Sequence, residues 1–253
     1  IVVYCARGGM RSQIFSDLLS KEGIEVYRLK DGYKRYRNWC LEKFSREHTS
    51  VVLSGKTGSQ KTERLFGLRE VGEAVIDLEG LAHHKGSAFG ALGQPEQPTQ
   101  EHFENKLAHA LFFELKKDQP VWYENESRLI GKVRIPDPLF DKIVIAPRVE
   151  IQPSFENRFD FLMENYGCFP SDELIEKTQL LTKRMGLEAN KKSIEALENG
   201  DKTEWLTLLM HYYDKAYEQG RLKQAVQPKT IQVPITENTT HAEIIAAKEI
   251  LLS

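Results

Sequence analysis

The sequence has few cysteines, no long apolar run and no excess of charge of one sign, and each absence excludes a class of protein. Three cysteines in 253 residues are too few for a disulfide framework and favour a reducing compartment, so we expect a cytoplasmic protein. No run approaches the ~20 apolar residues of a membrane-spanning helix. The formal net charge of -2 means that any nucleic-acid-binding surface must be a local patch.

The chain begins at Ile1, inside an apolar run over residues 1–4. This run has neither the preceding basic segment nor the small-residue cleavage site of a signal peptide. Its β-branched and aromatic residues instead predict a buried strand whose preceding partners are absent from the sequence.

The spacing of apolar residues predicts alternating strands and helices. Strands are expected at residues 1–4, 25–29, 50–54, 74–78, 121–124, 141–146 and 230–235, and helices at 13–21, 33–46, 63–70, 101–117 and 241–252. Residues 153–222 read as almost entirely helical, and residues 80–100 as a long functional loop. The alternation predicts an α/β fold with a parallel sheet and helices on both faces.

A cysteine stands where the first predicted strand ends. Cys5 opens a glycine-containing loop that leads into a helix, so backbone N–H groups and the helix N-terminus can lower its pKa and make it a nucleophile. The alternative is a small buried cysteine before a turn. Cys40 and Cys168 lack such surroundings, and both are expected in the core. The loop residues are Arg7, Gly8, Gly9, Met10, Arg11 and Ser12.

A second strand–loop–helix unit carries a phosphate-binding pattern with one mismatch. In a P-loop, backbone amides cradle phosphates, a lysine reaches the outer phosphate oxygens and a threonine hydroxyl meets Mg²⁺. The pattern requires Gly immediately before the lysine, where this chain has Gln60, and a side chain there brings strain and obstruction. The loop consists of Gly55, Lys56, Thr57, Gly58, Ser59, Gln60, Lys61 and Thr62.

Acidic residues end or follow two predicted strands, on the edge where α/β sheets bind ligands. They are candidates for acid, base or Mg²⁺ contacts, and the alternative is a solvated strand end. Arg128 suits a diphosphate through its two-pronged guanidinium group, and His83 and Lys85 are candidate substrate contacts. No firm metal site is expected from this pattern. The acidic candidates are Asp77, Glu79, Glu124 and Glu126.

Residues 27–46 form a basic and aromatic segment, with seven Lys or Arg against two Asp or Glu. Basic side chains bind phosphates, and aromatic rings stack on unpaired RNA bases. The alternative is a solvated helix whose aromatic residues face the core. The candidate RNA contacts are Arg28, Lys34, Arg35, Tyr36 and Arg37.

Several segments resemble one family. Residues 5–12 resemble the active-site loop of rhodanese-type sulfur transferases, especially the version in tRNA 2-selenouridine synthases. Residues 31–37, 77–90, 97–100, 103–105, 124–131 and 161–167 are also similar to that family. The chain departs from it at Gln60 and in lacking the front half of the rhodanese domain.

The resemblance implies a two-part organisation. Residues 1–48 would be the C-terminal part of a rhodanese-like domain, and residues 49–253 a P-loop NTPase-like domain in which 153–224 form a helical insertion or lid. The first part is smaller than the ~50 residues of a small domain, so we expect a chain that lacks its beginning.

The resemblance also implies a tRNA-modifying transferase that acts on the wobble uridine. In that family a geranyl group from geranyl diphosphate is placed on the sulfur of 2-thiouridine, and selenium from selenophosphate then replaces the geranylated sulfur. Cys5 is the candidate for the selenium step, and the P-loop for the diphosphate, with Mg²⁺ as a further candidate. The expected partner is tRNA, and no membrane is expected.

Two alternatives stay open on the sequence. One is a P-loop kinase or ATPase with a rhodanese-like regulatory module, which would turn over ATP without tRNA. The other is a non-catalytic RNA-binding protein with a decayed P-loop, and Gln60 is the feature that supports it.

Overall fold

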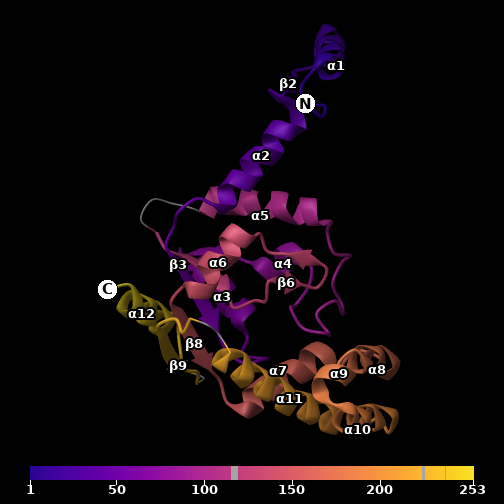
Figure 1. The fold of residues 1–253 in the computed structure, drawn as a ribbon, viewed down its shortest axis with the longest axis vertical. Coiled ribbons are helices and arrows are strands. Elements are labelled where there is room, and N and C mark those ends of the chain that lie inside the picture. The colour runs from indigo at the N-terminus through magenta and orange to yellow at the C-terminus, as the bar shows by residue number, and fades with distance from the viewer. Residues whose placement is uncertain (115–118, 224–225, 237) are drawn as a thin grey trace.

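The computed structural model describes residues 1–114, 119–223, 226–236 and 238–253 (Figure 1). Its central sheet has five strands in the order β4-β5-β3-β8-β9, and every pairing between them is parallel. The predicted parallel α/β fold is therefore confirmed. The strands are β3 (Ser50–Ser54), β4 (Ala74–Ile76), β5 (Val121–Glu124), β8 (Arg148–Gln152) and β9 (Thr230–Pro234).

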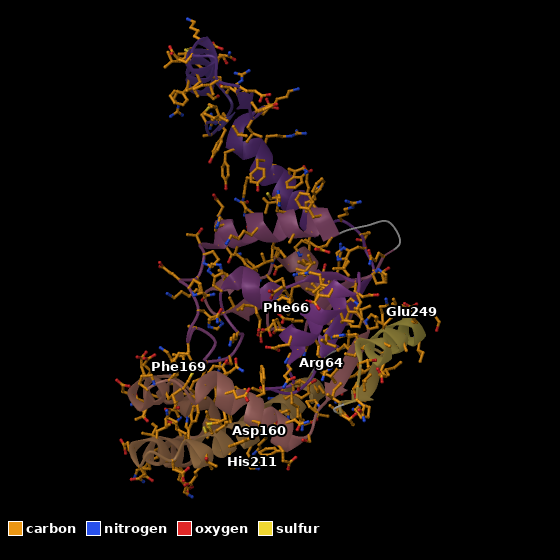
Figure 2. All side chains as sticks on the ribbon, turned by 180° about the vertical axis from the view of Figure 1, so that it is seen from behind. Arg64, Phe66, Asp160, Phe169, His211 and Glu249 are labelled. Atoms are coloured by element: carbon orange, nitrogen blue, oxygen red, sulfur yellow. The ribbon has the colours of Figure 1, made fainter. Side chains whose placement is uncertain are left out.

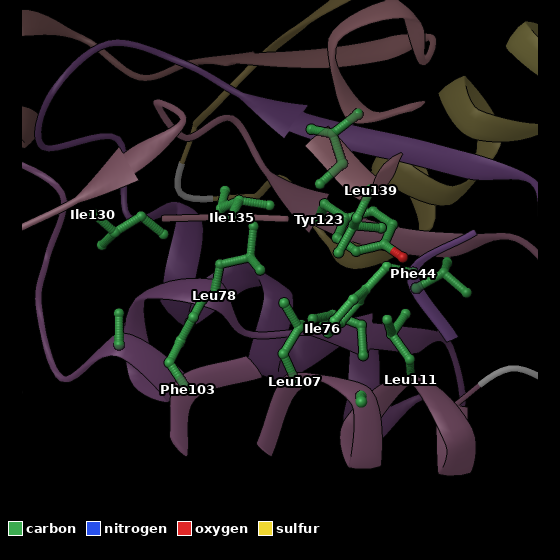
Figure 3. Close-up of a cluster of buried hydrophobic side chains, with 14 of the residues drawn as sticks. Phe44, Ile76, Leu78, Phe103, Leu107, Leu111, Tyr123, Ile130, Ile135 and Leu139 are labelled. Carbon is green, nitrogen blue, oxygen red and sulfur yellow. The ribbon is translucent and has the colours of Figure 1, made fainter. Parts of the chain in front are cut away.

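One face of the sheet packs against three helices. Alternate strand residues point to opposite faces, so Val52 enters this core while its two neighbours enter the other. In Figure 3, Phe103, Leu107 and Leu111, which recur at helical spacing, extend from their helix toward the sheet residue Ile76. The three helices are α2 (Gly32–Phe44), α5 (Gln100–Glu114) and α6 (Asp137–Ile145).

The opposite face is covered by the helix after the P-loop and by the last helix. Val51 and Leu53 of β3 are fully buried in this second core. The final helix is capped, because Thr240 and Glu243 form a capping box at its first turn. The two helices are α3 (Lys61–Glu70) and α12 (His241–Leu252).

The predicted helical region forms a separate layer beside the carboxyl edge of the sheet (Figure 1). Its own core contains Trp205, whose indole N–H donates a 3.0 Å hydrogen bond to Thr178 Oγ1. The layer consists of α7 (Phe155–Tyr166), α8 (Ser171–Gln179), α9 (Thr182–Met185), α10 (Leu187–Glu198) and α11 (Lys202–Leu222).

The N-terminal unit projects from the other end of the molecule, joined through α2 (Figure 1). It contains β1 (Val2–Val3), α1 (Met10–Lys21) and β2 (Tyr27–Arg28), and its two strands pair in parallel. Two short strands and one helix do not show a rhodanese fold by themselves, so that assignment stays a prediction. The division at residues 48 and 49 and the role of the helical layer as a lid also stay predictions.

Two sequence predictions were wrong. Of residues 141–146, which were predicted as a strand, residues 141–145 belong to α6, because Pro138 starts a helix and the buried Leu139 and Ile143 lie one helical turn apart. The strand β8 follows it instead. Cys168, expected in the core, is exposed, whereas Cys40 is buried as predicted.

Other boundaries differ less. The strand predicted at 25–29 is reduced to β2, and the loop predicted at 80–100 begins in a short helix, α4 (Leu78–Ala82). A small antiparallel hairpin, β6 (Leu129–Ile130) and β7 (Val133–Arg134), follows β5. Residues 115–117 of a predicted helix and residue 224 of the predicted helical region lie outside the described residues. No helix among the described residues is long and apolar enough to cross a membrane.

Candidate functional site

The P-loop residues lie between β3 and α3 and border a cavity of about 500 Å³, a size typical of small-molecule sites. Residues of α7 and α11 form its other side. In Figure 2, Phe66 of α3, which lines the cavity, lies on the sheet side, and Asp160 and His211 lie in the helical layer. Seven of the eight loop residues line the cavity. The exception, Lys56, is paired with Asp214 at 3.6 Å.

The mismatched residue of the loop adopts the backbone conformation that normally requires glycine. Gln60 has φ 58° and ψ 38°, in the left-handed region, immediately before α3. A non-glycine residue there is strained by roughly 1–2 kcal/mol. Gly58, with φ 81°, lies so close to Leu162 and the Arg158 carbonyl that a Cβ would clash. The loop therefore keeps the P-loop geometry at Gln60 despite the side chain.

The lysine and threonine of the loop face its interior and the carboxyl edge of the sheet. Lys61 Nζ donates a 3.3 Å hydrogen bond to the Gly55 carbonyl across the loop. Thr62 Oγ1 donates a 2.7 Å hydrogen bond to Glu124 Oε1 and lies 3.3 Å from Glu79 Oε2. These contacts bring the predicted phosphate loop and the predicted acidic residues into one site.

Three carboxyl groups gather beside the loop. Burial is the main cause that raises the pKa of Glu79, Glu124 and Glu126, and repulsion between the neighbouring carboxylates raises it further. Lys61 opposes the shift in each case. A cluster of this kind holds at least one proton near neutral pH, so it can accept or release a proton during a reaction.

The carboxyl cluster does not form a recognisable metal site. Among the described residues, no group of three or more His, Cys, Asp or Glu side chains is arranged to hold a metal ion. The Thr62 hydroxyl, the expected Mg²⁺ ligand, is hydrogen-bonded to Glu124. Binding of Mg²⁺ through Thr62 stays a prediction, and no chemical step below depends on it.

The wall opposite the loop is aromatic and apolar. Leu162 and Tyr166 of α7 and Tyr213 of α11 line the cavity, and together with Trp205 they also border a small apolar pocket of about 20 Å³. Burial raises the pKa of Tyr166 to about 12, which keeps its hydroxyl neutral. The cavity is thus polar at the loop and apolar at the helical layer.

A buried ion pair holds this apolar wall against the loop. Arg158 of α7 donates two hydrogen bonds to Asp214 of α11, at 2.8 and 2.7 Å, and a third of 3.1 Å to the Thr57 carbonyl. A buried guanidinium group is stable only when its donors are paired. Arg158 therefore fixes α7, α11 and the P-loop relative to one another.

The other predicted contacts are divided between the cavity and its surroundings. Asp77 lines the cavity and also caps α4 through a 2.7 Å bond from the Gly80 N–H. Lys85 lines it too, with Nζ 3.2 Å from Asn165 Oδ1. His83 instead contacts the Glu96 carbonyl at 2.9 Å and is not a lining residue.

Arg128 is placed away from the phosphate loop. Its guanidinium group pairs with Asp137 and Asp141 and lies over the ring of Phe140. It is not among the residues that line the cavity. The structure therefore does not bring Arg128 to the site for which the sequence suggested it.

Cys5 lies in the N-terminal unit, half-buried in the loop between β1 and α1. Its sulfur is 3.3 Å from Ser12 Oγ, and this hydrogen bond, followed by the Arg7 backbone N–H, lowers the pKa of the thiol to about 6. Cys5 is therefore mostly thiolate at neutral pH. Gly32 fits tightly against this loop, since a Cβ there would clash with the backbone of Cys5 and Gly8.

The rest of the Cys5 loop opens to solvent. Arg7, Gly9, Met10 and Arg11 are exposed, whereas Ser12 is buried and faces the thiol. The exposed arginines are available to an anion that approaches the sulfur.

The predicted RNA contacts separate into two groups. Arg28, Lys34 and Arg35 are exposed on the N-terminal unit. Arg37 pairs with Glu104 and donates a 3.0 Å hydrogen bond to Asn105 of α5, so it joins α2 to α5. Tyr36 stacks on Trp39.

Some residues of the site were not singled out from the sequence as site residues. Tyr213, Tyr217 and Asp214 lie on α11, about 150 residues after the P-loop, and no spacing rule connects them to it. Arg158 carried no sequence signal either. Their proximity to the loop follows only from the way the helical layer packs.

Comparison with known proteins identifies the family. The family described as tRNA 2-selenouridine synthase AAA domain matches residues 48–199. The tRNA 2-selenouridine synthase of Sulfurovum sp. is 33% identical over 86% of this chain and 67% of its own length. Those of Hydrogenovibrio crunogenus and Pseudomonas syringae pv. syringae are 36% and 34% identical, over 88% and 89% of this chain and 69% of their own lengths. The chain belongs to the tRNA 2-selenouridine synthase family.

Proposed function

We propose that this protein is a transferase that converts 2-thiouridine at the wobble position of tRNA to 2-selenouridine through an S-geranyl intermediate. Geranyl diphosphate and selenophosphate are the proposed co-substrates. The observation that carries the proposal is the P-loop cavity, which is polar at one end and aromatic at the other. A prenyl diphosphate has the same division between a charged head and an apolar chain.

The charged head fits the P-loop. Backbone N–H groups of the loop, the N-terminus of α3 and Lys61 Nζ can all face a diphosphate. They would stabilise the negative charge that develops when the bond between carbon 1 of the geranyl group and the diphosphate oxygen breaks. The apolar chain would lie against Leu162, Tyr166 and Tyr213.

The carboxyl cluster suits the proton transfer that alkylation requires. When the sulfur of 2-thiouridine bonds to carbon 1 of the geranyl group, the base loses the proton from its N3 atom. An ionised member of the cluster formed by Glu79, Glu124 and Glu126 can accept this proton, since its raised pKa makes it a stronger base than an exposed carboxylate.

The second step is assigned to the N-terminal unit. The selenium of selenophosphate adds to carbon 2 of the base and expels geranylthiolate, a better leaving group than the sulfur of the unmodified base. Attack of water on phosphorus then breaks the Se–P bond, which releases phosphate and leaves 2-selenouridine. Cys5 is the proposed residue of this step, because its thiol has a lowered pKa and lies beside Arg7 and Arg11.

The test uses tRNA that carries 2-thiouridine, incubated with geranyl diphosphate and selenophosphate, and analyses nucleosides by mass spectrometry. Wild-type protein should yield 2-selenouridine. Lys61→Ala should reduce S-geranyl-2-thiouridine at least tenfold, and Cys5→Ser should block selenium incorporation while geranylation continues. Lys132→Ala, an exposed lysine outside the cavity, is the control. Retained 2-selenouridine formation by Cys5→Ser would refute the role of Cys5, and ATP turnover without tRNA would favour a kinase or ATPase.

A further inference from the structure

A second groove lies between the N-terminal unit and α5. Its volume is about 750 Å³, and none of its lining residues lines the P-loop cavity. Tyr4, Tyr33 and Tyr36 line one side, and His102, Lys106 and His109 of α5 line the other. None of the steps proposed above uses this groove.

The tyrosines of the groove form a continuous aromatic row. Ring centroids are 6.1 Å apart between Tyr4 and Tyr33 and 5.9 Å apart between Tyr33 and Tyr36. Trp39 continues the row, with its ring 5.9 Å from that of Tyr36. Tyr4 ends the row and is 58% exposed, so it is accessible to a stacking partner.

The open end of the row adjoins the reactive cysteine. Tyr4 directly precedes Cys5, and the Tyr33 backbone N–H donates a 2.9 Å hydrogen bond to the Cys5 carbonyl. The Tyr33 hydroxyl is held between Glu101 Oε1 at 2.6 Å and Asn105 Nδ2 at 2.7 Å. This end of the groove is therefore positioned by both α2 and α5, beside the Cys5 loop.

One side of the groove belongs to the part of the chain that carries an excess of positive charge. Residues 1–48 contain ten Lys or Arg against six Asp or Glu, although the whole chain has a net charge of -2. Lys106 lines the opposite side of the groove, with the exposed His102 and His109 on either side of it along α5. Glu101 and Glu104, which also lie on this helix, are bonded to Tyr33 and Arg37.

We propose that this groove binds unpaired RNA bases, with a base stacked on Tyr4 and a backbone phosphate held by Lys106. Exposed rings in a row with cations opposite are the arrangement by which proteins hold single-stranded nucleic acid. The inference rests on the proposed function, which supplies tRNA as the substrate. It deepens that function by placing the anticodon loop beside Cys5.

The experiment measures the affinity of the full chain for a hairpin RNA that has the sequence of an anticodon stem-loop with 2-thiouridine at the wobble position. Fluorescence anisotropy is followed over a range of salt concentrations. Tyr4→Ala should weaken binding roughly tenfold, because stacking on the ring is lost, and Tyr4→Phe should bind like the wild type. Lys106→Ala should weaken binding and lower the salt dependence by about one phosphate contact.

A matched control lies on the same unit. Tyr27 is 60% exposed, like Tyr4, but does not line the groove, so Tyr27→Ala should leave the affinity unchanged. Geranylation of a free 2-thiouridine nucleoside, which needs the P-loop cavity alone, should survive Tyr4→Ala. Circular dichroism of each variant establishes that it is folded.

The outcomes are distinguishable. Equal RNA affinity of Tyr4→Ala and wild type would overturn the groove assignment while leaving the proposed function intact. The same holds if Tyr4→Ala alters only the oligomeric state in analytical ultracentrifugation, which would make the groove a protein interface. Absence of RNA binding and of tRNA modification by the wild type would instead overturn the proposed function.

Discussion

The hydroxyl of Thr62, in the first turn of α3, donates a 2.7 Å hydrogen bond to the buried carboxyl group of Glu124 at the end of β5. This bond connects the phosphate loop to the carboxyl cluster across neighbouring strands. The loop and the cluster are consequently one unit, and a change of charge in the cluster acts directly on the first turn of α3.

Glu124→Gln should make the protein less sensitive to rising pH. Burial raises the pKa of Glu124 above its ordinary value of 4.5, so the neutral acid stabilises the folded state. That stability is fully present below pH 4.5 and is lost as pH rises through the raised pKa. Glutamine is neutral at every pH, so its advantage over glutamate in the free energy of unfolding should grow by at least about 1 kcal/mol between pH 5 and 8.

Urea denaturation at several pH values, with a chelator present, measures this effect. Glu198→Gln, an exposed glutamate in the helical layer, should follow the wild-type profile. Parallel profiles for Glu124→Gln and the wild type would mean that Glu124 is ionised in the folded protein at neutral pH.

Ser12→Ala should suppress the reactivity of Cys5. The wild-type thiol has a pKa of about 6, so its alkylation by iodoacetamide should rise with an inflection near pH 6. Loss of the Ser12 hydrogen bond removes the largest cause of the lowered pKa, and the inflection should move toward the ordinary value of 9.0. Mass spectrometry of the Cys5 peptide separates this reaction from that of the exposed Cys168. Ser20→Ala serves as the control, and an unmoved inflection would contradict the role of Ser12.

Gln60→Gly should bind a phosphorylated ligand more tightly. The substitution relieves a left-handed residue and removes a side chain that lines the cavity. Calorimetry with geranyl diphosphate should show a lower dissociation constant. Asp31→Gly is the matched control, because Asp31 also has a left-handed φ of 59° but lies outside the cavity. Unchanged or weaker binding by Gln60→Gly would rule out obstruction at this position.

Asp214→Asn should loosen the helical layer. The substitution leaves Arg158, which is 4% exposed, without its charged partner. Breaking a buried pair from one side costs about 3 kcal/mol, and this loss should appear as a lower urea midpoint and faster proteolysis within α7–α11. Glu195→Gln breaks an exposed pair with Lys191 and should cost less than about 1 kcal/mol. Equal stability of the two variants would show that the Arg158 pair is not structural.

Short-range signals in the sequence predicted most of the fold. The spacing around Lys61 predicted a strand, a phosphate loop and a helix, and the structure has all three. The strand prediction at residues 141–146 was wrong because a short apolar run is compatible with a helix or with a strand, and Pro138 starts a helix here. Contacts such as Arg158 with Asp214 depend on tertiary packing, which no local pattern encodes.

The position of α2 separates Cys5 from the P-loop cavity. The helix α2 carries the N-terminal unit, which contains Cys5, away from the body of the molecule (Figure 1), while the P-loop cavity lies between the sheet and the helical layer. In this arrangement a single wobble base cannot occupy both sites at once. Under the proposed assignment of the two steps, the geranylated tRNA would therefore travel between the two sites, either by release into solution or by a swing of the N-terminal unit. An isotope-dilution experiment would distinguish the two routes, with unlabelled geranylated tRNA added while labelled 2-thiouridine tRNA is being converted. Release of the intermediate should reduce the fraction of 2-selenouridine product that carries the label. Direct transfer within the protein should leave that fraction unchanged.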